Sequence, residues 1–167
     1  TSGASNSASL CASGTTTGSN THAVVEEYNG TSWTDVGDVN TGSRRGVGAG
    51  TSTAAFIAGG QTGRPSVFTA VNETWNGTAW IEVTGIPTAR SAMSGAGTTT
   101  SGLIMGGNPI PIGVDSWNGT SLSEETDLNT PRDDAQGDGA SSTAAFYVGG
   151  SPDVTRDALA ETWNGST

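Results

Sequence analysis

The sequence predicts an all-β protein made of short antiparallel strands, and three observations lead to this prediction. Glycine contributes 26 of the 167 residues, while charged residues make up only 13%, which is poor material for long helices. Ten Trp, Tyr and Phe residues stand at regular positions, which argues for a small repeated core rather than a disordered chain. Three sequence landmarks also return at one nearly constant spacing, which is typical of stacked repeats.

The first landmark is an apolar strand that ends in two glycines. Copies over 54–60, 101–107 and 144–150 end at Gly59-Gly60, Gly106-Gly107 and Gly149-Gly150, and a degraded copy over 8–14 ends at Ser13-Gly14. The second glycines lie 46, 47 and 43 residues apart. Alternating small and apolar residues over 46–56, 94–104 and 137–147 lead into three of these strands and predict tightly packed hairpins near a crowded axis.

The second landmark is a short sequence motif, called here the phrase, in which an aromatic residue precedes Asn-Gly. Its four copies are Tyr28-Asn29-Gly30, Trp75-Asn76-Gly77, Trp117-Asn118-Gly119 and Trp163-Asn164-Gly165, spaced 47, 42 and 46 residues. Asn-Gly between strand-like residues predicts a two-residue hairpin turn of type I′, because both residues tolerate positive φ. A second aromatic follows in two copies, at Trp33 and Trp80. We expect these rings to pack against neighbouring units, with about 1.5–3 kcal/mol of stabilisation for each buried ring.

The third landmark is an arginine ten residues after the second aromatic position, where Trp80 leads to Arg90 and Leu122 leads to Arg132. In the first copy Ser43 takes this place, and the arginines Arg44 and Arg45 follow it. Because the arginine recurs once in each period, we expect it to fill a structural position. Each period then holds four short strands.

These residues resemble the kelch repeat, in which a hydrophobic strand ends in Gly-Gly and is followed by an aromatic, a Trp and a loop Arg. The second copy matches best, at Ile57, Gly59, Gly60, Trp75, Trp80, Val83, Pro87 and Arg90. The resemblance implies a kelch-like β-propeller, with about four blades or partial blades in this chain and four short antiparallel strands in each. The copies depart from the pattern at Tyr28, Ser43, Leu122 and Ser13-Gly14.

The repeat register divides residues 1–167 into a partial repeat over 1–14, repeats over about 15–60, 61–107 and 108–150, and a partial repeat over 151–167. The chain is then either a single propeller or a window of a longer one. We favour the window, because an open repeat array needs caps and the sequence contains none that we recognise.

The sequence pattern of the repeat, "WNGTxW" with "AGAGTxTAAxxxGG", resembles that of kelch-like tracts in bacteriophage virion and tail-associated proteins. That resemblance implies a non-enzymatic structural or attachment module, a tail fibre or surface appendage, located on the virion or the extracellular surface. Its expected partners are other virion or surface proteins, further copies of itself, and a host-surface glycan. The alternative is a secreted or cell-surface bacterial adhesin or filament protein that recognises polysaccharide. A propeller enzyme would instead need convergent carboxylates, an arginine cluster or a metal cage at the central opening.

The charge balance argues against two classes of partner. Six arginines, no lysine and sixteen acidic residues give a net charge of −10, which repels nucleic acid and anionic membrane surfaces. No apolar run approaches the roughly 20 residues of a membrane helix, so we expect no membrane insertion. We interpret the acidity as a device for solubility.

The sequence predicts no catalytic, metal or cofactor residue. Cys11 is the only cysteine and His22, expected in a loop, the only histidine, so neither a disulfide nor a zinc cluster can form within the chain. They also cannot reproduce the copper site of the kelch-type oxidase, which needs two histidines and a cysteine-linked tyrosine. The aspartates of 131–139 lack the calcium-loop spacing, so we expect a solvated loop there.

Two further features concern the surface. Asn29, Asn72, Asn76, Asn118 and Asn164 stand in Asn-x-Ser/Thr sequons. For four of them the turn already explains the asparagine, so glycosylation is the second interpretation. Phe68 is the main exposed loop aromatic that we expect, as a stacking platform for a sugar, and the residues of a receptor site stay open.

Overall fold

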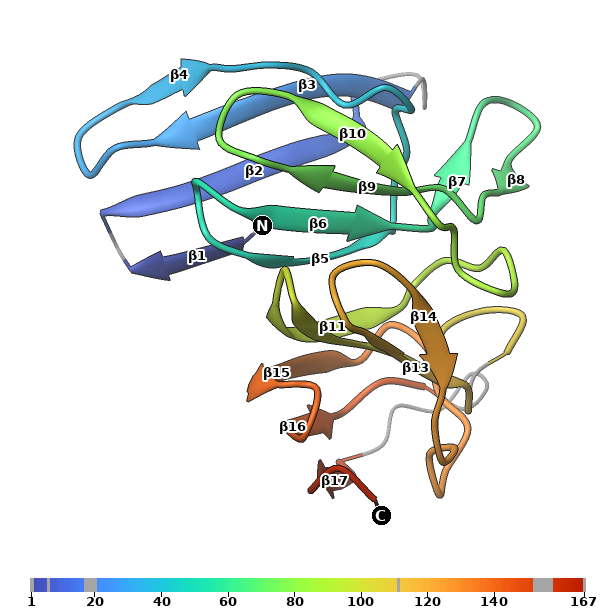
Figure 1. Cartoon of the computed structure of the whole chain (residues 1–167). Coiled ribbons are helices and arrows are strands. Elements are labelled where there is room, and N and C mark those ends of the chain that lie inside the picture. The colour runs from blue at the N-terminus through green and yellow to red at the C-terminus, as the bar shows by residue number, and fades with distance from the viewer. Residues whose placement is uncertain (1, 6, 17–20, 111, 152–157, 167) are drawn as a thin grey trace.

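The computed structural model describes residues 2–5, 7–16, 21–110, 112–151 and 158–166, and these residues form strands and loops (Figure 1). The first sheet contains β1 (Ser2–Ser5), β2 (Ala8–Thr15), β3 (Thr21–Tyr28) and β4 (Trp33–Asp35). The second contains β5 (Val47–Gly50), β6 (Ala55–Ala58), β9 (Asn72–Trp75) and β10 (Trp80–Val83). The third contains β11 (Ser94–Thr98), β12 (Ser101–Met105), β13 (Val114–Trp117) and β14 (Leu122–Glu124). The fourth contains β15 (Gln136–Ser141), β16 (Ala144–Val148) and β17 (Ala160–Trp163).

Each of these four sheets is an antiparallel meander in which consecutive strands of the sheet pair with one another. In the second sheet a small hairpin, β7 (Gln61–Thr62) and β8 (Val67–Phe68), is inserted between β6 and β9. The prediction of an all-β chain built from short antiparallel strands is therefore confirmed. Across the part of the chain that the structure describes, no helix has the length and apolarity to cross a membrane.

The sheets are out of phase with the repeat counted from one glycine doublet to the next. Strands β5 and β6 lie within 15–60, whereas β9 and β10, which complete their sheet, lie within 61–107. The third sheet is divided in the same way. Each of these two sheets is therefore assembled from two consecutive periods.

The first strands of successive sheets lie against one another, since β1 contacts β5, β5 contacts β11 and β11 contacts β15. Glycine permits this approach. A Cβ added to Gly95 would collide with the Val47 side chain, and one added to Gly137 would lie 2.6 Å from Met105 Cε. Small residues are therefore needed where the sheets converge.

Three hydrophobic clusters fill the spaces between consecutive sheets. The cluster between the first and second sheets contains Leu10, Val25, Val39, Ala55, Trp75 and Trp80. The next includes Phe56, Met93, Ile104 and Trp117, and the last includes Leu103, Met105, Val114 and Tyr147. The core thus consists of separate apolar layers between the sheets, so each sheet buries its apolar side chains against the neighbouring sheets.

The aromatic pairs at the hairpins are buried to different extents. Trp75 and Trp80 face each other across β9 and β10 with ring centroids 5.4 Å apart, and their exposed fractions are 4% and 6%. Tyr28 and Trp33 form the equivalent pair at 5.2 Å, but Trp33 is 48% exposed. Among the described residues, the expectation that these rings are buried therefore holds for Trp75 and Trp80 but not for Trp33.

The Asn-Gly corners differ from the predicted type I′ turns. Tyr28 pairs with Trp33 and Trp75 with Trp80, so four residues rather than two form each loop. Among the described residues, no asparagine of these loops has positive φ. The Asn76 side-chain oxygen instead accepts the amides of Thr78 (2.9 Å) and Ala79 (3.0 Å). This Asx-turn bonding explains the asparagine, and Gly77, with a φ of 92°, explains the glycine.

The glycine doublets follow directly on β6, β12 and β16, and the first two of them contact the next connector. Gly59 and Gly60 have φ values of 62° and 105°, and the Gly60 amide donates to the Arg90 carbonyl at 2.8 Å. Gly107 donates to the Arg132 carbonyl at 3.4 Å in the same manner. These two doublets therefore join consecutive sheets through the backbone.

Candidate binding face

The recurrent arginines lie inside the protein. Arg90, on the connector that enters the third sheet, pairs with Asp115 of β13 at 2.5 Å, and these side chains are 3% and 4% exposed. Arg132, on the connector into the fourth sheet, pairs with Glu161 of β17 and is fully buried. Each arginine thus joins a connector to the third strand of the sheet that follows, and neither is available to a ligand.

Arg132 organises a small polar network. Its guanidinium also donates to the carbonyls of Leu159 (2.9 Å) and Gly149 (3.3 Å), and it lies 5.1 Å from the centre of the Tyr147 ring. Burial raises the pKa of Tyr147 and the arginine charge lowers it; burial has the larger effect, and the resulting pKa is about 12. Burial alone would raise the pKa of Glu161, but hydrogen bonds from Asn129 and Arg132 outweigh it and hold that pKa below its ordinary value.

A wide cleft of about 860 Å³ lies between β5, β11 and β15. Residues 46–51, 93–98 and 136–140 line it, together with Phe146. Most of these residues are Gly, Ala, Ser and Thr. Asp138 is the one ionisable residue in the lining, and its carboxylate accepts the Gly139 amide at 2.7 Å. The lining lacks the paired acid and base that hydrolysis needs.

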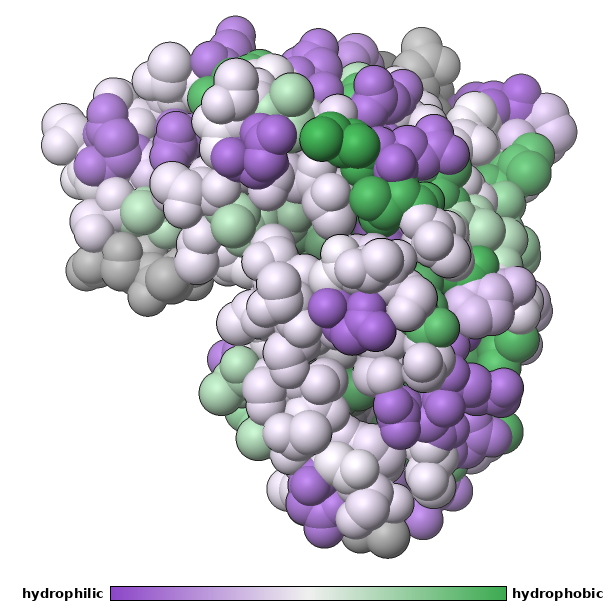
Figure 2. All heavy atoms as spheres, in the orientation of Figure 1, coloured by the Kyte–Doolittle hydropathy of each residue, from purple (hydrophilic) through white to green (hydrophobic). Residues whose placement is uncertain are grey.

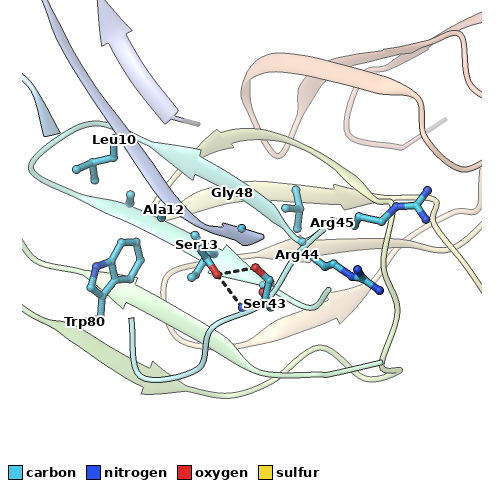
Figure 3. Close-up of a pocket in the computed structure, with 14 residues that line it drawn as sticks. Leu10, Ala12, Ser13, Ser43, Arg44, Arg45, Gly48 and Trp80 are labelled. Atoms are coloured by element: carbon cyan, nitrogen blue, oxygen red, sulfur yellow. Dashed lines mark hydrogen bonds between the residues drawn. The ribbon is translucent and has the colours of Figure 1, made fainter. Parts of the chain in front are cut away.

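A narrower groove of about 110 Å³ lies between the first and second sheets (Figure 3). Leu10, Ala12 and Trp80 form its apolar side, and Ser13 and Ser43 lie together on its polar side. The Ser13 hydroxyl donates to the Ser43 carbonyl at 2.6 Å and accepts the Ser43 amide at 2.7 Å. This contact joins the first sheet to the connector that enters the second.

The half-buried Arg44 and the exposed Arg45 lie on that connector, close to the β7–β8 hairpin that carries Arg64. Arg44 pairs through its backbone with Gln61 of β7, at 3.0 and 2.9 Å, and its guanidinium donates to the Ser66 hydroxyl. Arg64 lies in the hairpin turn and is exposed, and the neighbouring Arg45 reaches Asp134 of a later connector. Of the five arginines that the structure describes, Arg44 and Arg64 thus belong to this hairpin region, and Arg45, next to Arg44 in the chain, pairs with Asp134.

Apolar side chains accompany these charges. Val67 is 60% exposed and Phe68 is 36% exposed, both on β8. Figure 1 shows the hairpin projecting from the body, and Figure 2 shows hydrophobic colouring on the same side. We call Arg44, Arg45, Arg64, Val67 and Phe68 the arginine face. It combines cationic and aromatic groups on an otherwise acidic protein.

Several residues singled out in the sequence have simple structural roles. His22 lies in β3 rather than in a loop, and its Nε2 is 2.9 Å from the Thr16 hydroxyl. The prediction of a loop was wrong because strand pairing with β2 extends to Thr21. Cys11 is exposed. Within the described ranges, no group of three His, Cys, Asp or Glu residues is placed to hold a metal ion.

The sequons divide into two kinds. Asn29, Asn76, Asn118 and Asn164 are exposed at the hairpin corners. Asn72 is fully buried and donates to the Thr84 carbonyl at 3.1 Å. A glycan on Asn72 is therefore incompatible with this fold.

The sequence reasoning missed the carboxylates that pair with the arginines. Asp115 and Glu161 stand two residues before an aromatic, as Glu26 and Glu73 do, so a comparison of the four phrases would have revealed an acidic position. The β7–β8 hairpin was missed as well, because its strands have only two residues each.

No family model and no curated protein matches the chain. Among solved structures, the chain is similar to one described as the structure of YjhT, with a TM-score of 0.69 and 10% sequence identity. The match covers 84% of this chain and 49% of the other, so this chain spans about half the length of that protein. At this identity the likeness concerns the fold alone.

Proposed function

We propose that the chain is a kelch-like β-propeller module that attaches a bacteriophage virion, as part of a tail fibre or surface appendage, to a glycan on the host surface. In this proposal the arginine face holds an anionic part of the glycan, and Phe68 stacks on a sugar ring. The module has no catalytic role. Its loops also contact neighbouring virion proteins or further copies of the same chain.

The propeller part of the proposal is supported by the order of the sheets. Consecutive meanders place their first strands together, β1 with β5, β5 with β11 and β11 with β15, as blades around an axis would. The kelch-like landmarks of the sequence agree with this arrangement. Images of the intact assembly that show a disc with a central opening would support it, and an open stack of sheets would contradict it.

The arginine face is the single observation that carries the binding part of the proposal. A net charge of −10 repels anionic ligands in general, yet Arg44, which reaches Ser66, and the exposed Arg64 belong to the same hairpin region as exposed Val67 and Phe68. Guanidinium groups bind carboxylate and sulfate oxygens in pairs of hydrogen bonds, and an aromatic ring adds apolar contact. A hairpin that projects from a rigid sheet is a typical place for such recognition.

Binding of the labelled protein to host cells and to arrays of acidic and neutral polysaccharides tests the proposal. Phe68→Ala and Arg64→Ala should each lower the affinity about tenfold or more, as expected for central contacts of an interface. Ile81→Ala is the matched control, because Ile81 is 52% exposed on β10, away from the hairpin. The control should stay within about twofold of the wild type.

Three results would contradict the proposal. Equal losses in the control and the hairpin variants would place recognition elsewhere. Preference for neutral over acidic polysaccharides would exclude the role of the arginines. Release of sugar fragments during incubation would identify an enzyme instead.

A further inference from the structure

One arginine position of the repeat is occupied by a serine, and its surroundings differ from those of the other two. Ser43 stands where Arg90 and Arg132 stand on the later connectors. A small cavity of about 10 Å³ lies beside it, lined by residues that include Ser43, Gly59, Thr69, Val71 and Glu73.

Glu73 is the carboxylate that an arginine at position 43 would face. It is fully buried, as Asp115 is nearly fully buried in its ion pair with Arg90. Glu73 accepts the Asn40 amide and side chain, each at 2.8 Å, and the Thr41 amide at 2.8 Å. Among the described residues no arginine or histidine forms an ion pair with it. A buried carboxylate without a counter-ion is costly even when it is hydrogen-bonded.

The fourth sheet shows what this position is built to hold. There the guanidinium of Arg132 lies among the Gly149 carbonyl, the Leu159 carbonyl and the Glu161 carboxylate. The matching groups of the second sheet are Gly59, Val71 and Glu73, and all three line the cavity. The Ser43 hydroxyl donates to the Gly59 carbonyl at 3.2 Å, and the Thr69 hydroxyl accepts the Val71 amide at 3.1 Å. The second sheet thus keeps an oxygen-lined cation position without its arginine.

The size and charge of the cavity restrict its ligand. About 10 Å³ is near the smallest cavity that holds one water molecule, so with Ser43 in place there is room for a monoatomic ion but not for an organic ammonium ion. Its lining combines the apolar Ile57 and Ala58 with three hydroxyl-bearing residues and a single carboxylate, and hard cations prefer such oxygen atoms. One negative charge is balanced by one monovalent ion, whereas calcium sites usually combine several carboxylates.

We propose that Glu73, Ser43 and the carbonyls beside them bind one small alkali cation, with sodium as the ion that fits. The ion replaces the charge of the missing arginine and links the connector to β9. Ser43 lines both this cavity and the groove between the first two sheets. The site is independent of glycan binding at the arginine face.

Thermal unfolding of the whole chain in sodium, potassium, caesium and choline chloride at equal ionic strength tests this inference, because equal ionic strength keeps charge screening the same. Sodium at about ten times its Kd should raise Tm by roughly 3–6 °C over choline. Sodium NMR relaxation should also be faster with the wild type than with Glu73→Gln, which preserves the shape of the side chain and removes its charge.

Ser43→Arg and Ser43→Ala are the paired variants. Ser43→Arg supplies the guanidinium found on the other connectors, so it should abolish the difference between the salts. Ser43→Ala removes one proposed oxygen ligand and retains the carboxylate, so it should weaken that difference without abolishing it. Equal Tm values in all four salts would overturn the inference in favour of a water molecule. An undiminished sodium effect in Ser43→Arg or Glu73→Gln would overturn it in favour of a general surface effect.

Discussion

Replacing Arg90 by methionine should destabilise the protein strongly through the loss of one buried ion pair. Methionine retains much of the length of the side chain and removes its charge. Asp115, 4% exposed, would then be left with a charge that no arginine balances, since Arg90 is the only residue with which it forms an ion pair among the described residues. Removal of one partner of a buried pair costs about 3–5 kcal/mol.

This cost can be expressed as a change in melting temperature. For a chain of this length each kcal/mol shifts Tm by about 2–4 °C, so Arg90→Met should lower Tm by roughly 6–20 °C. Asp115→Asn should also destabilise, because it leaves the guanidinium without a counter-charge. The double variant should lose less than the sum of the two single losses, with a coupling of about 1 kcal/mol or more.

Urea unfolding followed by tryptophan fluorescence measures these differences, since Trp75, Trp80 and Trp117 are buried in the apolar layers between the sheets. The control is Arg45→Met, which removes an exposed ion pair whose side chains are 49% and 57% exposed, and it should cost no more than about 1 kcal/mol. A loss below about 1 kcal/mol for Arg90→Met, or strictly additive single losses, would refute the view that this pair holds the connector to the third sheet.

Three other outcomes are expected. Gly106→Ala should lower the free energy of unfolding in urea by about 2–4 kcal/mol, because φ is 63° and the new Cβ would lie 2.6 Å from the Arg132 carbonyl. Gly63 is the control, since it has the same φ but the nearest atom to a new Cβ is 3.9 Å away. Gly63→Ala should therefore cost only about 1–2 kcal/mol. Burial raises the pKa of Tyr147 to about 12 from its ordinary 10.0, so as the pH rises this phenol ionises in the unfolded chain before it ionises in the folded one. The free energy of unfolding that this residue contributes is therefore complete below pH 10 and should fall as the pH rises towards 12. Thermal melts across that range should show the fall, and Tyr147→Phe should reduce it; an unchanged profile would contradict the burial argument. Folded protein from a glycosylating host should carry no sugar on Asn72, which peptide mapping by mass spectrometry checks, and a glycan there would show that β9 does not pack as described.

The periodic landmarks predicted the strands well because strand formation along this chain follows local patterns. The strand before Gly106-Gly107 and the hairpin around Asn118-Gly119 are readable within a few residues. The turn type was harder to predict. It depends on which residues pair across the hairpin, and the pairing of Trp117 with Leu122 makes a longer loop than Asn-Gly alone suggests.

The arginine position was predicted from spacing, but its partner was not. Asp115 lies 25 residues from Arg90 in the chain and Glu161 lies 29 residues from Arg132, with two strands between the members of each pair. Local patterning carries no information on that contact. The same limitation applies to Glu73, whose burial could not be inferred from a phrase that also contains the exposed Glu26.

The sequence by itself determined the β class, the period and the residues that recur, because alternation, turn residues and spacing act over short distances along the chain. Only the tertiary structure decided that strands of two consecutive periods share a sheet, and that the acidic and basic positions meet between a connector and the following strand. It alone also revealed the arginine face and the cavity beside Ser43. These features depend on which surfaces cover one another, and burial of that kind is a property of the packed sheets rather than of any single segment.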